Sequence, residues 1–180
     1  MSSAAGLFFA LALLSTIAFV PTGARGDGFK RGRYQGTFEY VGTSPQARRT
    51  IDRAIEEVTD EMGFLKDGIA QDRLEDKLTT LPTITIEFEG TMVAVTLRGS
   101  TYQSRIGGGW APATNPDGDE VQIRHRIKNG KLVEEIRTDK GRRINVFAAK
   151  SDTRLVVTTI VTSPKLPSDI RYALMYQRKK

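Results

Sequence analysis

Residues 117–180 decide the fold and read DGDEVQIRHRIKNGKLVEEIRTDKGRRINVFAAKSDTRLVVTTIVTSPKLPSDIRYALMYQRKK. Runs rich in β-branched side chains, such as 121–127 and 155–161, alternate with turn pairs such as Asn129-Gly130. Short runs separated by tight turns are typical of antiparallel strands that follow one another in a meander. A meander of this length tends to close on itself. The sequence therefore predicts a mainly β fold, an antiparallel up-and-down β-barrel of about 8–10 strands, with residues 120–178 as its C-terminal meander.

A helical segment interrupts the strands early in the chain. After a first strand over 34–41, apolar residues recur at steps of four and three from Ile51 to Ile69, which is the period of an amphipathic helix. Ser44 is expected to cap this helix, with Pro45 at the first helical position. The stripe continues past two glycines, so the sequence predicts a helical pair after the first strand, forming a lid over residues 44–79.

The N-terminus has the features of an export signal. Leu7–Val20 is an almost unbroken apolar run, and the small residues Thr22 and Ala24 follow it. We expect residues 1–24 to be a cleaved signal peptide and 25–180 to form a single barrel domain, with an uncleaved membrane anchor as the alternative. The chain contains no cysteine, so no disulfide staples the domain. Together these features predict a periplasmic or secreted protein.

The charge balance limits the partners. The chain has 27 basic and 21 acidic residues, a formal net charge of +6, but the basic residues are dispersed among acids. Dispersed charge predicts no nucleic-acid binding, while a positive excess predicts weak association with an anionic membrane surface. We expect the protein to be a monomer.

The residues needed for common catalytic chemistry are scarce. There is one histidine, no cysteine and no serine in a Gly-x-Ser-x-Gly turn, so we expect a non-enzymatic protein without a metal site or cofactor. His125 shares its strand register with Ile123 and Ile127, which favours an interior histidine. Glu134 and Glu135 are adjacent on a strand and are expected to point to opposite faces.

The predicted strand around His125 is polar on one face and apolar on the other. Gln122, Arg124 and Arg126 alternate with Ile123 and its apolar neighbours. If the polar face pointed inward, two arginines would line a wet cavity suited to an anionic group. We expect the polar face to point outward, because a buried unpaired arginine is costly.

The order of strand, helical pair and meander resembles the fatty-acid-binding protein family within the calycin, or lipocalin-like, barrels. Tyr34-Gln-Gly36-Thr37-Phe38 is similar to the family's opening motif of an aromatic residue, any residue, Gly, Thr and Trp. The turn elements Glu89-Gly90, Asp117-Gly118 and Asn129-Gly130, together with 175–178, follow in the family's order over nearly all of the chain beyond residue 24. The resemblance implies a barrel with one interior ligand.

Two departures from the family bear on the ligand and on the number of strands. The resemblance implies a fatty-acid carboxylate held by two arginines and a tyrosine; Tyr176 matches the tyrosine, but Leu174 and Ala148 stand at the arginine positions. The ligand is therefore neutral, or another arginine compensates its charge. The stretch between Leu97 and Asp117 looks one strand short of the family pattern, which predicts a barrel of eight or nine strands.

We therefore expect an exported carrier of a small apolar or lipid-like ligand. The predicted ligand-binding residues are Tyr176, Tyr172, Phe38 and Trp110, each of which also fits as a plain core aromatic. The alternative is a filled β-barrel, an interaction or structural module whose basic surface meets a protein partner or an anionic envelope component.

Overall fold

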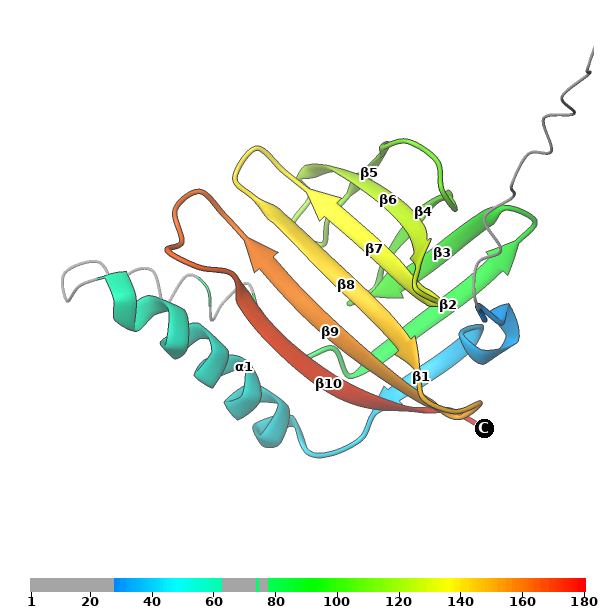
Figure 1. Ribbon diagram of the computed structural model, residues 1–180, viewed down its shortest axis with the longest axis horizontal. Helices are drawn as coiled ribbons and strands as arrows, with labels where there is room; N and C mark the ends of the chain where they lie inside the picture. Colours follow the sequence, from blue (N-terminus) through cyan, green and yellow to red (C-terminus); the bar gives the residue numbers. More distant parts are fainter. Residues whose placement is uncertain (1–27, 63–73, 75–77) are drawn as a thin grey trace, which may run out of the picture.

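The computed structural model describes residues 28–62, 74 and 78–180, and these residues form a strongly curved antiparallel sheet with one α-helix beside it (Figure 1). The sheet has ten strands. In chain order they are β1 (Gly36–Tyr40), β2 (Thr83–Glu89), β3 (Met92–Leu97), β4 (Ser100–Arg105), β5 (Ala111–Thr114), β6 (Glu120–Lys128), β7 (Lys131–Arg137), β8 (Arg142–Ala149), β9 (Arg154–Thr162) and β10 (Ile170–Arg178). The predicted fold class is confirmed.

The sheet is an up-and-down barrel that is nearly closed. Its strand order is β4-β3-β2-β1-β10-β9-β8-β7-β6-β5, which leaves β4 and β5 at the two edges. At this seam the segment after β4 reaches past the short β5 to β6: a parallel bridge joins Ile106 to His125, and the Gly107 N–H donates to the His125 carbonyl at 2.8 Å. The seam is thus held by isolated contacts where the other strand pairs have continuous ladders.

The count of ten strands lies within the predicted range of about 8–10 and corrects only the narrower expectation of eight or nine that the comparison with the family suggested. The extra strand is β5, which lies within 107–118, a stretch without the alternation that marks a strand. β5 is short, contains Pro112 and pairs only with β6. An edge strand pairs on one side only, so it tolerates a proline, which has no backbone N–H to donate. Its sequence therefore need not show the regular alternation of apolar and polar residues that identifies a packed strand.

The meander strands alternate between the barrel interior and the outside, as predicted. On β6, Val121, Ile123 and His125 are buried, whereas Gln122 and Arg126 are exposed and Arg124 is partly so. The apolar face of β6 therefore points inward, as its pattern indicated. Alternate residues of β7 to β10 continue this inward face from strand to strand.

The helix α1 (Ser44–Thr59) begins one residue earlier than predicted. Thr43, not Ser44, is the N-cap: its hydroxyl accepts from the Gln46 backbone N–H, and the Gln46 side chain accepts from the Thr43 N–H. Both bonds satisfy helix-terminal donors, and Pro45 fits within the first turn because it has no donor to satisfy. The buried side of α1, which includes Ile51 and Ile55, packs against β10.

Two other predictions lie outside the described residues. They are the signal peptide over 1–24 and most of the second helix of the predicted pair, since α1 ends in a short 3-10 turn, Asp60–Met62. Of the helical residues that the structure describes, none form a helix long and apolar enough to cross a membrane.

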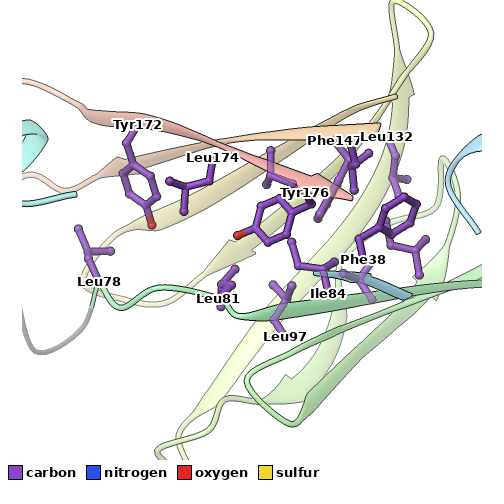
Figure 2. Close-up of a cluster of buried hydrophobic side chains, with 14 of the residues drawn as sticks. Phe38, Leu78, Leu81, Ile84, Leu97, Leu132, Phe147, Tyr172, Leu174 and Tyr176 are labelled. Carbon is purple, nitrogen blue, oxygen red and sulfur yellow. The ribbon is translucent and has the colours of Figure 1, made fainter. Parts of the chain in front are cut away.

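One end of the barrel interior is filled with side chains. Phe38, Leu132, Phe147 and Leu155 are fully buried, and Tyr176 is 1% exposed. Figure 2 shows Phe38, Phe147, Leu132 and Tyr176 grouped together, with Tyr172 and Leu174 farther along β10 and facing Leu78 and Leu81. Interior packing at this end leaves room for a cavity only toward the other end of the strands.

An outer arginine cluster, defined here as Arg124, Arg126 and Arg142 around Glu135, ties β6, β7 and β8 together on the outside. Arg124 Nη2 donates to Glu135 Oε2 at 2.8 Å, Arg142 Nη1 donates to the same oxygen at 3.3 Å, and Arg126 binds Oε1. Burial of this carboxyl acts to raise its pKa, but the bonds and charges of Arg124 and Arg126 outweigh burial and hold the pKa of Glu135 below its ordinary value.

Replacing Glu135 by glutamine should destabilise the fold at neutral pH by about 1–3 kcal/mol, because two or three arginines lose the charge that they surround. A carboxyl with a lowered folded-state pKa stabilises the fold above its unfolded pKa of about 4.3, and this contribution is lost as pH falls through the folded value. Urea unfolding should therefore separate wild type from Glu135→Gln at pH 7, and the difference between the two should shrink as the pH is lowered below about 4.3.

Glu39→Gln is the matched control, because Glu39 pairs with Lys179 at the surface, where the two side chains are 51% and 61% exposed. Exposed pairs contribute little, so this variant should unfold at the same urea concentration as wild type throughout the pH series. A difference for Glu135→Gln that stayed constant down to the lowest pH at which wild type still folds would show that the charge of Glu135 is not what stabilises the cluster.

Candidate ligand-binding site

A cavity of about 390 Å³ lies between the filled end of the barrel and the turns at its other end. Its wall is apolar and its mouth is polar. The wall residues are Leu78, Leu81, Leu97, Val121, Ile136 and Val161; residues at the mouth include Arg98, Asn115, Asp117, Thr138, Lys140 and Ser163. This volume lies in the lower part of the range found for small-molecule sites.

Arg143 is an arginine inside the barrel. It precedes Asn145 by two positions on β8, so it shares the inward face, and it lines the cavity. Its Nε donates to Asn145 Oδ1 at 3.3 Å, while its buried Nη2 has no hydrogen-bond partner among the residues that the structure describes. No ion pair joins Arg143 to any residue that the structure describes. A cationic residue therefore forms part of the cavity lining, although its Nη2 is itself buried.

A row of polar side chains crosses the barrel interior. On β8 it passes through Asn145, the next inward-facing position after Arg143. We call it the polar ladder: Ser104 on β4, His125 on β6, Glu134 on β7, Asn145 on β8 and Thr159 on β9. All five are at most 3% exposed. The register places His125 opposite Glu134, Glu134 opposite Asn145 and Asn145 opposite Thr159.

Hydrogen bonds link each member of the polar ladder to the next. His125 Nε2 lies 3.3 Å from Glu134 Oε1, and its Nδ1 lies 2.7 Å from Ser104 Oγ. With its proton on Nε2, the imidazole donates to the carboxylate and accepts from the serine. Asn145 Nδ2 donates to Glu134 Oε2 at 2.7 Å, and Thr159 Oγ1 donates to Asn145 Oδ1 at 2.9 Å.

The polar ladder changes two of the expectations from sequence. The interior position of His125 is confirmed, but the interior is not purely apolar. A serine, a histidine and a carboxylate do come together, which the sequence search for a nucleophile with its base did not find. Ser104, His125 and Glu134 do not line the cavity, so these three hydrogen-bonded side chains lie within the packed interior. Glu134 and Glu135 do point to opposite faces.

Three of the four predicted ligand-binding residues lie in the barrel interior. Phe38 is fully buried and has the Arg178 guanidinium 4.7 Å from its ring centre. Tyr176 is 1% exposed, and burial, reinforced by Tyr172, raises the pKa of its hydroxyl well above the ordinary value. Tyr172 is 6% exposed and pairs with Thr159 in register. These three residues do not border the 390 Å³ cavity. The cavity lining includes Val161 of β9, the strand next to β10.

Trp110 lies elsewhere, on the outside of the barrel. Arg124 and Arg137 place their guanidinium carbons 4.2 and 4.0 Å from its ring centre. Trp110 borders an outer groove of about 540 Å³ together with Arg137 and Pro164. Its ring therefore interacts with two cations rather than with the interior cavity.

Sequence reasoning missed Arg143 as a residue of the cavity lining. The available signal was that Arg143 alternates with Asn145 and Phe147 along β8, and that no charged residue follows Arg143 within this strand.

Comparison with known proteins identifies the class of fold. No family model matches the sequence, and no curated protein matches it either. Among solved structures, fatty-acid-binding protein 1 of Echinococcus granulosus is 13% identical, with 82% of this chain and 98% of that chain covered and a TM-score of 0.51. The chain has a fatty-acid-binding-protein-like calycin fold, and its similarity to these proteins is distant.

Two further neighbours have the same architecture. Lipid binding protein 8 of Caenorhabditis elegans is 13% identical, covering 83% of this chain and 98% of its own, with a TM-score of 0.52. A secretary abundant heat soluble protein from Ramazzottius varieornatus is 10% identical, covering 84% and 99%, with a TM-score of 0.56. At these identities the likeness establishes the fold alone.

The polar ladder predicts a measurable difference between two threonines of β9. Thr159→Val removes a buried donor to Asn145 and should lower the free energy of unfolding by about 1 kcal/mol. Thr158→Val, on the outer face of the same strand, should change it by less than about 0.5 kcal/mol. Chemical denaturation of both variants measures the difference; equal unfolding midpoints would mean that the ladder contributes no stability through Thr159.

Proposed function

We propose that this protein is a non-enzymatic binding protein that holds or carries a small apolar or lipid-like ligand inside its barrel. The observation that carries the proposal is the cavity of about 390 Å³ with an apolar wall. An apolar cavity open to water is unfavourable to leave hydrated, and a ligand of matching shape gains the free energy of removing both surfaces from water.

The distribution of side chains supports entry from one end. The mouth is formed by turns between consecutive strands, at Arg98, Asp117, Lys140 and Ser163, whereas the opposite interior is filled by residues such as Phe147. A ligand therefore enters between these turns and stops at the packed interior. Two structural neighbours, a fatty-acid-binding protein and a lipid binding protein, support a ligand of lipid type.

The cavity predicts that filling it will abolish binding. In Val161→Trp the indole occupies the space beside Arg143, so binding of the neutral fluorescent probe N-phenyl-1-naphthylamine should fall by about tenfold or more. Val156→Trp, on the outward face of β9, is the matched control and should bind the probe as wild type does. Fluorescence titration measures both, with circular dichroism to confirm folding.

Native mass spectrometry of the gently purified protein, before and after organic extraction, provides a second test. A mass excess that extraction removes identifies a bound ligand and gives its mass. An apo mass together with no probe binding by wild type would contradict the carrier proposal and favour the filled barrel that acts through its basic surface.

We also propose that the chain is exported, which rests on the apolar run Leu7–Val20 and the small residues after it. The full-length chain expressed in a bacterial host should appear in the periplasm or medium with its N-terminus at Arg25. Intact-mass measurement of the recovered protein tests this. A chain that keeps residues 1–24 and sediments with membranes would instead have an uncleaved anchor.

A further inference from the structure

We propose that the filled end of the barrel, opposite the cavity mouth, is a docking surface for a linear sulfated glycan. We call this surface the basic end and define it by four segments of the chain, residues 30–33, 128–131, 150–154 and 178–180. The inference goes beyond the carrier proposal, because it concerns the outside of the protein and applies to a barrel with or without a ligand.

The fold gathers these four segments at one place. Tyr34 Oη donates to the Gly130 carbonyl at 2.8 Å, which holds the segment before β1 against the turn between β6 and β7. Arg178 donates from Nη2 to the Gly32 carbonyl at 3.0 Å and from Nε to the Asp152 carbonyl at 2.8 Å. These bonds add the end of β10 and the turn between β8 and β9. In Figure 1 the start of β1 and the C-terminus accordingly lie at the same end of the sheet, away from the turn between β9 and β10.

The basic end has a large excess of positive charge. Its four segments contain ten basic residues and one acidic residue, Asp152. The turns at the mouth end, residues 98–99, 115–119, 138–141 and 163–169, contain three basic and four acidic residues. The basic residues are dispersed along the sequence, so the asymmetry arises only when the fold brings the segments together. A surface with this excess of one charge attracts polymers of the opposite charge.

Most of the cations of the basic end are free to meet a partner. Two of the ten form ion pairs, Arg33 with Asp152 and Lys179 with Glu39. The other eight take part in none of the ion pairs among the residues that the structure describes. Glu89, in the neighbouring turn between β2 and β3, adds one carboxylate at the margin. The charge that remains is therefore strongly positive.

The surface chemistry favours a glycan over a lipid bilayer. Among the described residues, the large hydrophobic side chains that are exposed are Val41 and Met175, and neither belongs to the basic end. Proteins that lie on a bilayer bury apolar side chains in its interface, and the strength of binding scales with that apolar area. Phe29, which precedes the first basic segment, is stacked on Tyr34 with the ring centres 4.6 Å apart. Charge without an apolar anchor suits a polyanion dissolved in water.

Two further properties favour a sulfated glycan over a nucleic acid. Proteins that bind single-stranded nucleic acids stack the bases on aromatic side chains, and the four segments contain no aromatic residue. The proposed export would also bring the protein to acidic glycans outside the cytoplasm. Sulfate groups repeated along such a chain accept charge-assisted hydrogen bonds from lysine and arginine side chains.

The test is calorimetric titration of the protein with a heparin decasaccharide in 0.15 M salt. Lys128→Gln combined with Lys131→Gln should weaken binding about tenfold or more, because each cation that contacts a polyanion contributes a factor of about five at this salt concentration. The slope of log Kd against log salt concentration should also fall by about one to two. Lys150→Gln combined with Lys180→Gln removes two charges from other segments and should act similarly. All four lysines are exposed, so their loss should leave the fold intact, as circular dichroism checks.

Arg49→Gln combined with Arg53→Gln is the matched control. Both arginines are exposed on α1, outside the basic end, and the double substitution removes the same two charges from the protein. If the local surface binds the glycan, this variant should keep the wild-type Kd within about twofold.

Each alternative result overturns a stated part of the inference. Absence of heparin binding by wild type, or equal weakening in all three double variants, overturns the basic end as a docking surface. Vesicles of phosphatidylcholine and phosphatidylglycerol at 1:1 and a 20-base-pair DNA duplex are titrated in the same salt. Binding to either as tight as binding to heparin overturns the glycan as the partner. None of these results bears on probe binding in the cavity, so the carrier proposal is tested separately.

Discussion

The buried carboxylate of Glu134 is the constraint on which the interior of this barrel depends. A fully buried acid is tolerated only where its oxygens find donors, and here His125 and Asn145 supply them from the two neighbouring strands. A slip of one residue in either pairing would turn one donor outward and leave one carboxylate oxygen without its partner. The hydrogen bonds therefore specify the register of β6, β7 and β8 more strictly than apolar packing alone would.

The same row of side chains divides the interior into two parts. On one side Phe38, Phe147 and Leu155 leave no space, and on the other side the wall of Leu97, Val121 and Val161 encloses the cavity. Arg143 stands at the boundary, because Asn145 belongs to the polar ladder and also holds the guanidinium. One amide side chain therefore serves both parts of the interior: Asn145 donates to Glu134 and accepts from Arg143, which lines the cavity.

The fold was largely predictable from the sequence, because its signals are local. The turn at Asn129-Gly130 and the alternation along β6 determine which face is buried, and the helix period determines α1. The same two-residue turn places His125 opposite Glu134, so this pair was within reach of a register argument. Ser104 was not, because it meets His125 across the seam between strands that share no ladder. Arg143 was also missed, since a four-residue turn before β8 leaves its face ambiguous. The edge strand β5 escaped detection because it lacks the alternation of a packed strand.

The seam between β4 and β5 has a mechanical consequence. Every other neighbouring pair of strands is joined by a continuous ladder, so separating any of them would break many bonds together. Here β4 is joined to β6, beyond the short β5, by the bridge from Ile106 to His125, the hydrogen bond from Gly107 to His125 and the hydrogen bond between His125 and Ser104. Opening the barrel along this line would therefore break fewer hydrogen bonds than separating any other pair of neighbouring strands. His125 takes part in each of these contacts, because its backbone carbonyl accepts from Gly107 and its ring is hydrogen-bonded to Ser104.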